Sequence, residues 1–158
     1  MNGENFKRCM DFVFKWEGGL VDDPKDRGGI TKYGVSLRAH PKLGREGIKA
    51  LTKAGAIEIY RKEYWLPTGA DALAWPLCLL VFDTAVNRGI LIASRYLKAA
   101  AATGEKEALK LSESIAKSRK QGYEEIVRKN PSQKRFLKGW MNRLNDLRET
   151  AGLEKETR

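Results

Sequence analysis

The sequence predicts a mainly α protein, folded as a single globule, with a glycine-rich loop or small hairpin after its first helix. Apolar residues recur at helical spacing along most of the chain, which indicates amphipathic helices. Glycine, proline and aspartate are instead concentrated in residues 18–36, a composition typical of loops and turns. With 158 residues, the chain is long enough to bury a core without disulfides or metal ions.

The first helix is expected over residues 4–17. Its apolar side chains recur at helical spacing, at Phe6, Cys9, Met10, Val13 and Phe14. Gly18 and Gly19 follow directly and are expected to end the helix. In the loop that comes next, a short hairpin is expected around residues 30–35.

The rest of the chain is expected to be helical. Helical patterning resumes near Gly47, and Thr52 is a residue type that commonly caps a helix N-terminus. Helices are then expected over residues 52–65, 77–87, 91–102, 107–129 and 133–150. The expected breaks are residues 67–76, Gly89, Thr103–Gly104 and Asn130-Pro131-Ser132.

The chain is strongly basic, with 30 Lys and Arg against 20 Asp and Glu and a net charge of +10. Such a chain is attracted to polyanions, which include nucleic acid, anionic membranes and bacterial wall polymers. Ten basic residues of the C-terminal helices are expected mostly on a solvated face, with attraction to an anionic wall or membrane as the functional alternative: Lys117, Arg119, Lys120, Arg128, Lys129, Lys134, Arg135, Lys138, Arg143 and Arg148. Composition alone does not choose among the polyanions.

Neither a metal nor another cofactor is expected. Cys9 and Cys78 lie in apolar runs typical of free buried thiols, with a single disulfide as the alternative, and His40 is the only histidine. The N-terminus shows no signal peptide, and the apolar runs are far shorter than a membrane-spanning helix. Synthesis in the cytoplasm is therefore expected.

Glu17 is the first candidate for chemistry, because a carboxylate is unfavourable at the negative C-terminal end of a helix. The partial negative charge of the helix end and apolar neighbours such as Trp16 would favour the protonated form of Glu17. A protonated carboxylic acid can donate a proton to a glycosidic oxygen. Gly18 and Gly19 leave room for a substrate beside it. The alternative is a solvated surface glutamate.

Hydrolysis of a glycosidic bond generally needs a second group. Asp26 lies in a polar loop, where it is expected to stay ionised and activate a water or stabilise positive charge on the sugar. Thr31 is a candidate for holding that water. Asp22 and Asp23 are rivals, and all three aspartates are alternatively turn residues.

Five segments carry a family resemblance: residues 16–19 (WEGG), 26–35 (DRGGITKYGV), 59–65 (IYRKEYW), 82–89 (FDTAVNRG) and 136–143 (FLKGWMNR). The chain resembles glycoside hydrolase family 108, phage and bacterial muramidases with a lysozyme-like fold. The last two segments resemble the start and end of the peptidoglycan-binding segment usually attached to it. The resemblance divides the chain into a catalytic segment, residues 1–75, and a helical peptidoglycan-binding segment, residues 76–158, expected in the same globule.

The resemblance implies that Glu17 is the catalytic residue, because it matches the family's glutamate before Gly-Gly. The spacing from Glu17 to Asp26 also matches that of the phage-type lysozymes, whereas Thr31 lies one residue closer to the aspartate than in their pattern. The implied activity is endo-acting cleavage of the β-1,4 bond between N-acetylmuramic acid and N-acetylglucosamine. The implied partner is the peptidoglycan glycan strand, with additional attraction to an anionic wall or membrane.

Five further residues are expected to contact substrate: Tyr33, Tyr64, Trp65, Asp83 and Asn87. The aromatic rings would stack on sugar faces, and Asn87 would bind an N-acetyl group or a hydroxyl. Each alternatively belongs to the core or to a structural hydrogen bond. Without a signal peptide, the enzyme would reach the wall or periplasm through a holin, as a phage endolysin, or serve secretion.

Two other classes of function stay open. One is a non-catalytic peptidoglycan-binding module, in which Glu17 would be dispensable. The other is a nucleic-acid binder, which the net charge alone supports, so no nucleic-acid partner is expected. A monomer is expected.

Overall fold

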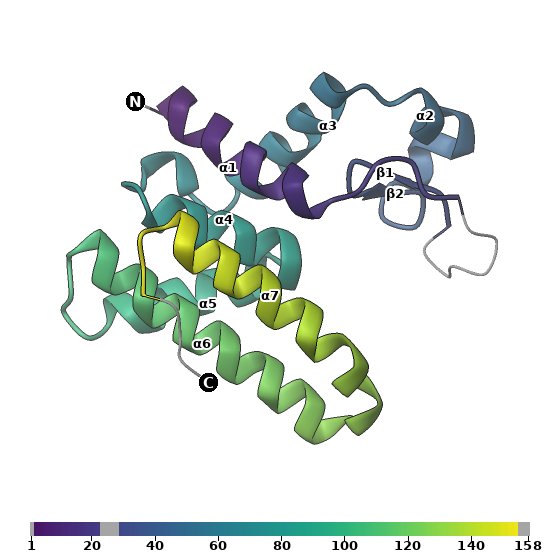
Figure 1. Cartoon of the computed structure of the whole chain (residues 1–158). Helices are drawn as coiled ribbons and strands as arrows, with labels where there is room; N and C mark the ends of the chain where they lie inside the picture. The colour runs from purple at the N-terminus through teal and green to yellow at the C-terminus, as the bar shows by residue number, and fades with distance from the viewer. Residues whose placement is uncertain (1, 23–28, 155–158) are drawn as a thin grey trace. The chain divides into compact units, whose positions relative to one another are not determined.

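In a computed structural model that describes residues 2–22 and 29–154, the chain forms seven α-helices and one two-stranded hairpin (Figure 1). The mainly α fold with a hairpin after the first helix is therefore confirmed. The chain divides into two compact units. The helical unit comprises Met1–Cys9 and Tyr64–Arg158, and the hairpin unit comprises Met10–Glu63. The boundaries of these units differ from the expected boundary between residues 75 and 76. The division into a catalytic and a peptidoglycan-binding segment remains a prediction.

The first helix, α1 (Asn2–Trp16), contributes residues to both units. The rest of the hairpin unit holds β1 (Thr31–Lys32), β2 (Val35–Ser36), α2 (Gly44–Ala50) and α3 (Lys53–Tyr60). Thr52 caps α3, as expected, because its hydroxyl accepts a hydrogen bond of 3.0 Å from the N–H of Gly55. The helix expected over residues 52–65 instead changes at Tyr60 into a π-helical turn, Arg61–Trp65.

The helical unit is built on α4 (Leu77–Arg88), which packs against both α5 (Ile90–Ala101) and α6 (Ala108–Lys129). Helix α7 (Lys134–Thr150) packs against α6 (Figure 1). Residues 77–85 of α4 are all buried, as its nearly continuous apolar sequence predicts. Gly89 ends α4 with a φ of 90°, a conformation that favours glycine, and α5 begins at the next residue.

One buried carboxylate joins three of these helices. The side chain of Asp83, on α4, is fully buried and accepts hydrogen bonds from Arg119 Nη1 of α6 at 2.6 Å and from Arg143 Nη2 of α7 at 2.7 Å. The network continues outward, because Arg119 Nε donates to the hydroxyl of Tyr123 at 2.7 Å. That hydroxyl in turn donates to Asn87 Oδ1 at 2.6 Å.

Three of the ten basic residues are exceptions to the mostly solvated face that the sequence predicts. Arg119, Arg143 and Arg148 are buried rather than on a solvated face. Each has a carboxylate partner, which is the condition under which a guanidinium group is tolerated in a core: Arg119 and Arg143 bind Asp83, and Arg148 binds Glu113 at 3.0 Å.

An aromatic and sulfur cluster packs the N-terminal half of α1 into the helical unit. The ring of Phe6 lies 5.1 Å from that of Trp65, which lies 5.4 Å from that of Phe82. Cys9 and Cys78 are free and buried, as expected, and a mutual hydrogen bond together with burial raises the pKa of the Cys9 thiol. None of the helices among the described residues is long and apolar enough to cross a membrane.

Asp83→Asn should destabilise the helical unit by about 3–5 kcal/mol, because the two buried guanidinium groups lose their counter-charge. Urea unfolding followed by circular dichroism measures this. The matched control is Glu125→Gln, because Glu125 forms an ion pair of the same type with Arg128 in an exposed position. That control should unfold close to the wild type, and equal stability of the Asp83 variant would show that the buried network does not stabilise the fold.

Stability should also fall in acid, with Asp83 as one cause. Burial by itself raises the pKa of Asp83, but the Arg119 and Arg143 guanidinium groups outweigh it, so the pKa lies below its usual value. The resulting stabilisation is complete above the unfolded-state pKa of about 3.9 and is lost as the pH falls through the folded-state value. Unfolding midpoints at pH 7 and pH 3 should therefore differ less for Asp83→Asn than for the wild type. An equal difference in both proteins would contradict this assignment.

Candidate active site

Glu17 directly follows the last residue of α1. Its N–H donates a hydrogen bond of 2.9 Å to the carbonyl of Val13, so its backbone continues the final turn of the helix. The residue is half-buried. This is the position that the sequence predicts, at a helix C-terminus with part of the side chain shielded from solvent.

Gly18 and Gly19 are both exposed. A Cβ atom added to either residue would meet no described atom within 4 Å, and neither has the positive φ that restricts other residues. The backbone therefore does not require glycine at these two positions. Room for a substrate beside Glu17 remains a prediction.

The hairpin lies next along the described chain. Thr31 pairs with Ser36 and Lys32 with Val35 in an antiparallel register. Tyr33 and Gly34 form the two-residue loop with φ of 52° and 78°, the positive values at both positions that define a type I′ turn. Such a turn matches the twist of the two strands, and it fixes where the loop backbone lies.

Glu17 reaches this turn. A Cβ atom added to Gly34 would lie 3.0 Å from both Cγ and Oε2 of Glu17, and it would collide with the hydroxyl of Tyr60. The Tyr60 hydroxyl donates a hydrogen bond of 3.1 Å to the carbonyl of Tyr33. Gly34 and Tyr60 both lie in segments that carry the family resemblance, but neither was predicted as a site residue from sequence.

Thr31 lies between two neighbouring chain segments. Its N–H and C=O exchange 2.8 Å hydrogen bonds with Val21, so residue 21 extends the hairpin on its other side. The Thr31 hydroxyl donates to the carbonyl of Gly29 at 3.4 Å. Its predicted role in holding a water remains a prediction.

The aspartates of the loop are only partly described. Asp26 and Asp23 lie outside the described residues, so the arrangement of Asp26 relative to Glu17 stays a prediction. Asp22 is described, and its carboxylate accepts a hydrogen bond of 2.7 Å from Arg45 Nη2. This ion pair gives Asp22 a structural partner and favours the alternative in which it shapes the loop.

The expected substrate contacts separate into three groups. Trp65 and Asp83 are 1% and 0% exposed and are held by the aromatic cluster and the arginine network, which favours the structural alternative for both. Asn87 is half-buried, and its carbonyl oxygen accepts a structural hydrogen bond from Tyr123. Tyr33 and Tyr64 are half-buried, and their contacts with sugar remain predictions.

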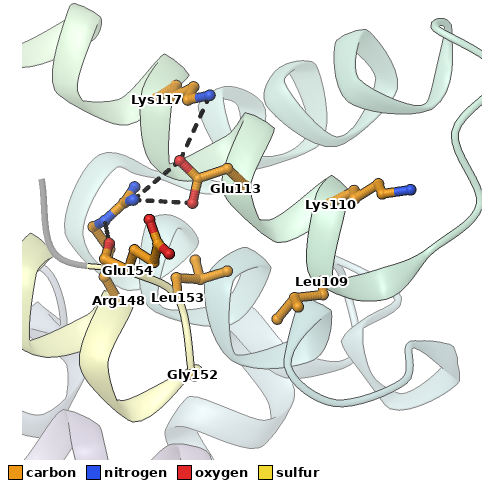
Figure 2. A pocket seen from close by; sticks show the side chains of 8 residues that line it. All are labelled: Leu109, Lys110, Glu113, Lys117, Arg148, Gly152, Leu153 and Glu154. Carbon is orange, nitrogen blue, oxygen red and sulfur yellow. Dashed lines mark hydrogen bonds and ion pairs between the residues drawn. The ribbon is translucent and has the colours of Figure 1, made fainter.

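The helical unit contains a pocket of about 510 Å³ between the start of α6 and residues 148–154. Figure 2 shows the Glu113 carboxylate lying between Arg148 and Lys117. Glu113 binds Arg148 at 3.0 Å and Lys117 at 3.7 Å, so these opposite charges largely satisfy one another. The residues predicted for the site do not line this pocket. Within residues 2–22 and 29–154, no three His, Cys, Asp or Glu side chains are grouped as metal ligands.

Comparison with known proteins identifies the family. The family model described as Glycosyl hydrolase 108 matches residues 10–89, and the family model described as Predicted Peptidoglycan domain matches residues 77–145. Among solved structures, the chain is similar to Brucella abortus SagA, with 27% sequence identity, 94% of each chain covered and a TM-score of 0.79. No curated protein matches the chain. Because the first of these models covers more than half of the sequence and contains Glu17 with its hairpin, the chain belongs to the glycosyl hydrolase 108 family.

Proposed function

We propose that the protein is an endo-acting muramidase that hydrolyses the β-1,4 bond between N-acetylmuramic acid and N-acetylglucosamine in peptidoglycan. Membership of a glycosyl hydrolase family supports the reaction class, and the peptidoglycan-domain match supports the substrate class. The observation that carries the proposal is the position of Glu17, which is half-buried at the end of α1 and is followed by the exposed Gly18 and Gly19.

In the proposed reaction, Glu17 donates its proton to the glycosidic oxygen as the bond from that oxygen to the anomeric carbon breaks. A water adds to the anomeric carbon and gives up a proton to the second carboxylate. Asp26 is the proposed second group, since the ion pair with Arg45 engages the rival Asp22. Thr31 is proposed to orient the water. The reaction needs no cofactor.

The rest of the chain is proposed to hold the glycan strand. The peptidoglycan-domain match spans most of α4 to α7. The net charge of +10 would add attraction to anionic wall polymers or membrane lipid. We propose that the protein acts as a monomer, on the wall or in the periplasm, after release from the cytoplasm through a holin or in support of secretion.

One other function has a specific observation in its favour. The peptidoglycan-domain match would equally suit a non-catalytic wall-binding module. The two functions differ in what they require of Glu17, because binding does not need an acid and hydrolysis does.

Glu17→Gln should fold normally and lose about 10²–10⁴-fold in wall-cleaving rate, the usual contribution of a general acid. The assay is release of soluble fragments from purified peptidoglycan, with pelleting on the same material to measure binding. Asp22→Asn is the control and should keep most of the activity. A Glu17 variant within tenfold of the wild-type rate would exclude it as the acid, and a wild type that binds without cleaving would favour the module.

Gly18→Ala should fold like the wild type but lower kcat/KM at least about tenfold, because the methyl group would enter space proposed for the sugar. The structure accommodates this atom, so a loss of activity would report on the substrate rather than on folding. The matched control is Gly3→Ala, near the start of α1 and outside both family matches, where an added Cβ also meets no described atom within 4 Å. Unchanged kcat/KM in the Gly18 variant would place the substrate elsewhere.

A further inference from the structure

Three elements of the hairpin unit meet at Gly34. They are the end of α1, which carries Glu17, the turn between β1 and β2, and the end of α3, which carries Tyr60. In Figure 1, the chain passes from the end of α1 toward the hairpin. Side chains from both helix ends reach the place that a Cβ atom of residue 34 would occupy.

Tyr60 is firmly held at this point. Its side chain is 3% exposed, and its ring lies edge-on to that of Phe14, with centroids 6.2 Å apart. Phe14 also packs against the ring of Tyr33 at 5.9 Å. The hydroxyl of Tyr60 donates to the carbonyl of Tyr33 within the turn. Ring packing and the hydrogen bond together tie the turn to α3.

Gly34 is required here for two separate reasons. Its φ of 78° favours glycine, as at several other positions of the chain. In addition, the Tyr60 hydroxyl and the Glu17 carboxyl group occupy the space of a side chain at residue 34. The second reason is specific to this site, because it connects the turn backbone to the proposed general acid.

We propose that Tyr60 and Gly34 position the Glu17 carboxyl group for proton transfer. Tyr60 fixes the turn through the Tyr33 carbonyl, and the bare Cα of Gly34 provides the surface against which the carboxyl group rests. Neither is proposed as a catalytic residue, since each acts through Glu17. The inference rests on the proposed function, and it adds the residues that set the geometry of the acid.

A general acid must lie within hydrogen-bond reach of the oxygen that it protonates, at about 2.6–3.2 Å. A displacement of about 1 Å can cost on the order of 10²-fold in rate. Loss of positioning should therefore lower kcat, whereas KM should change less, because Tyr33 is the only predicted sugar contact on this turn. A purely structural role would lower stability without this separation of kcat from KM.

The experiment compares Tyr60→Phe and Gly34→Ala with two matched controls. Tyr96→Phe removes the same atom from a buried tyrosine whose hydroxyl lies against Gly122 of α6 in the helical unit. Gly69→Ala introduces left-handed backbone strain of the same kind, at a φ of 68° and a ψ of 19°, but its Cβ meets no described atom within 4 Å. All four are assayed for kcat and KM on solubilised glycan strands, and for thermal unfolding.

The expected fall in kcat is about tenfold for Tyr60→Phe and about 10²-fold for Gly34→Ala, with KM within about threefold of wild type. Both controls should keep the wild-type kcat. A wild-type kcat in Tyr60→Phe, or an equal fall in kcat in either control, would overturn the inference. Should Gly34→Ala fail to fold, Tyr60→Phe decides alone, since it deletes a single oxygen. Glu17→Gln is assayed alongside: an active Glu17 variant rejects the proposed function, whereas an inactive one beside a fully active Tyr60→Phe rejects only the positioning role.

Discussion

The helical unit depends on the burial of one charge. A carboxylate removed from water is costly unless nearby cations and hydrogen bonds replace its hydration. Asp83 meets this condition because α6 and α7 each supply a guanidinium group, at 2.6 and 2.7 Å. The requirement constrains three helices together, since both arginines must face α4 at the level of one residue. Apolar packing alone is non-directional and does not impose that register.

The same network explains why polar residues on a buried helix are ambiguous in sequence. Asp83 and Asn87 lie four residues apart on one face of α4, as the lining of a binding cleft would. Their partners are instead Arg119, Arg143 and Tyr123, which are distant in sequence. A satisfied structural network and a substrate-binding wall use the same residue types. They differ only in whether the partner comes from the protein or from a ligand.

The hairpin unit follows a different principle, in which backbone geometry rather than charge places the groups. A type I′ turn at Tyr33 and Gly34 brings a residue without a side chain against the end of α1. The Glu17 carboxyl group lies in that space, together with the hydroxyl of Tyr60. In the proposed enzyme, the absence of a side chain at Gly34 therefore leaves room for the carboxyl group of the acid. The buried Tyr60 contributes by fixing the turn.

The sequence by itself determined most of the helices, the hairpin, the Thr52 cap and the position of Glu17 at a helix end, because these depend on local periodicity and on residue type. Family motifs within residues 10–89 were also readable directly. Only the tertiary structure decided that Trp65, Asp83 and three C-terminal arginines are buried, and that Tyr60 meets Gly34. Those outcomes depend on pairing between residues 17 to 60 positions apart, which periodicity does not encode.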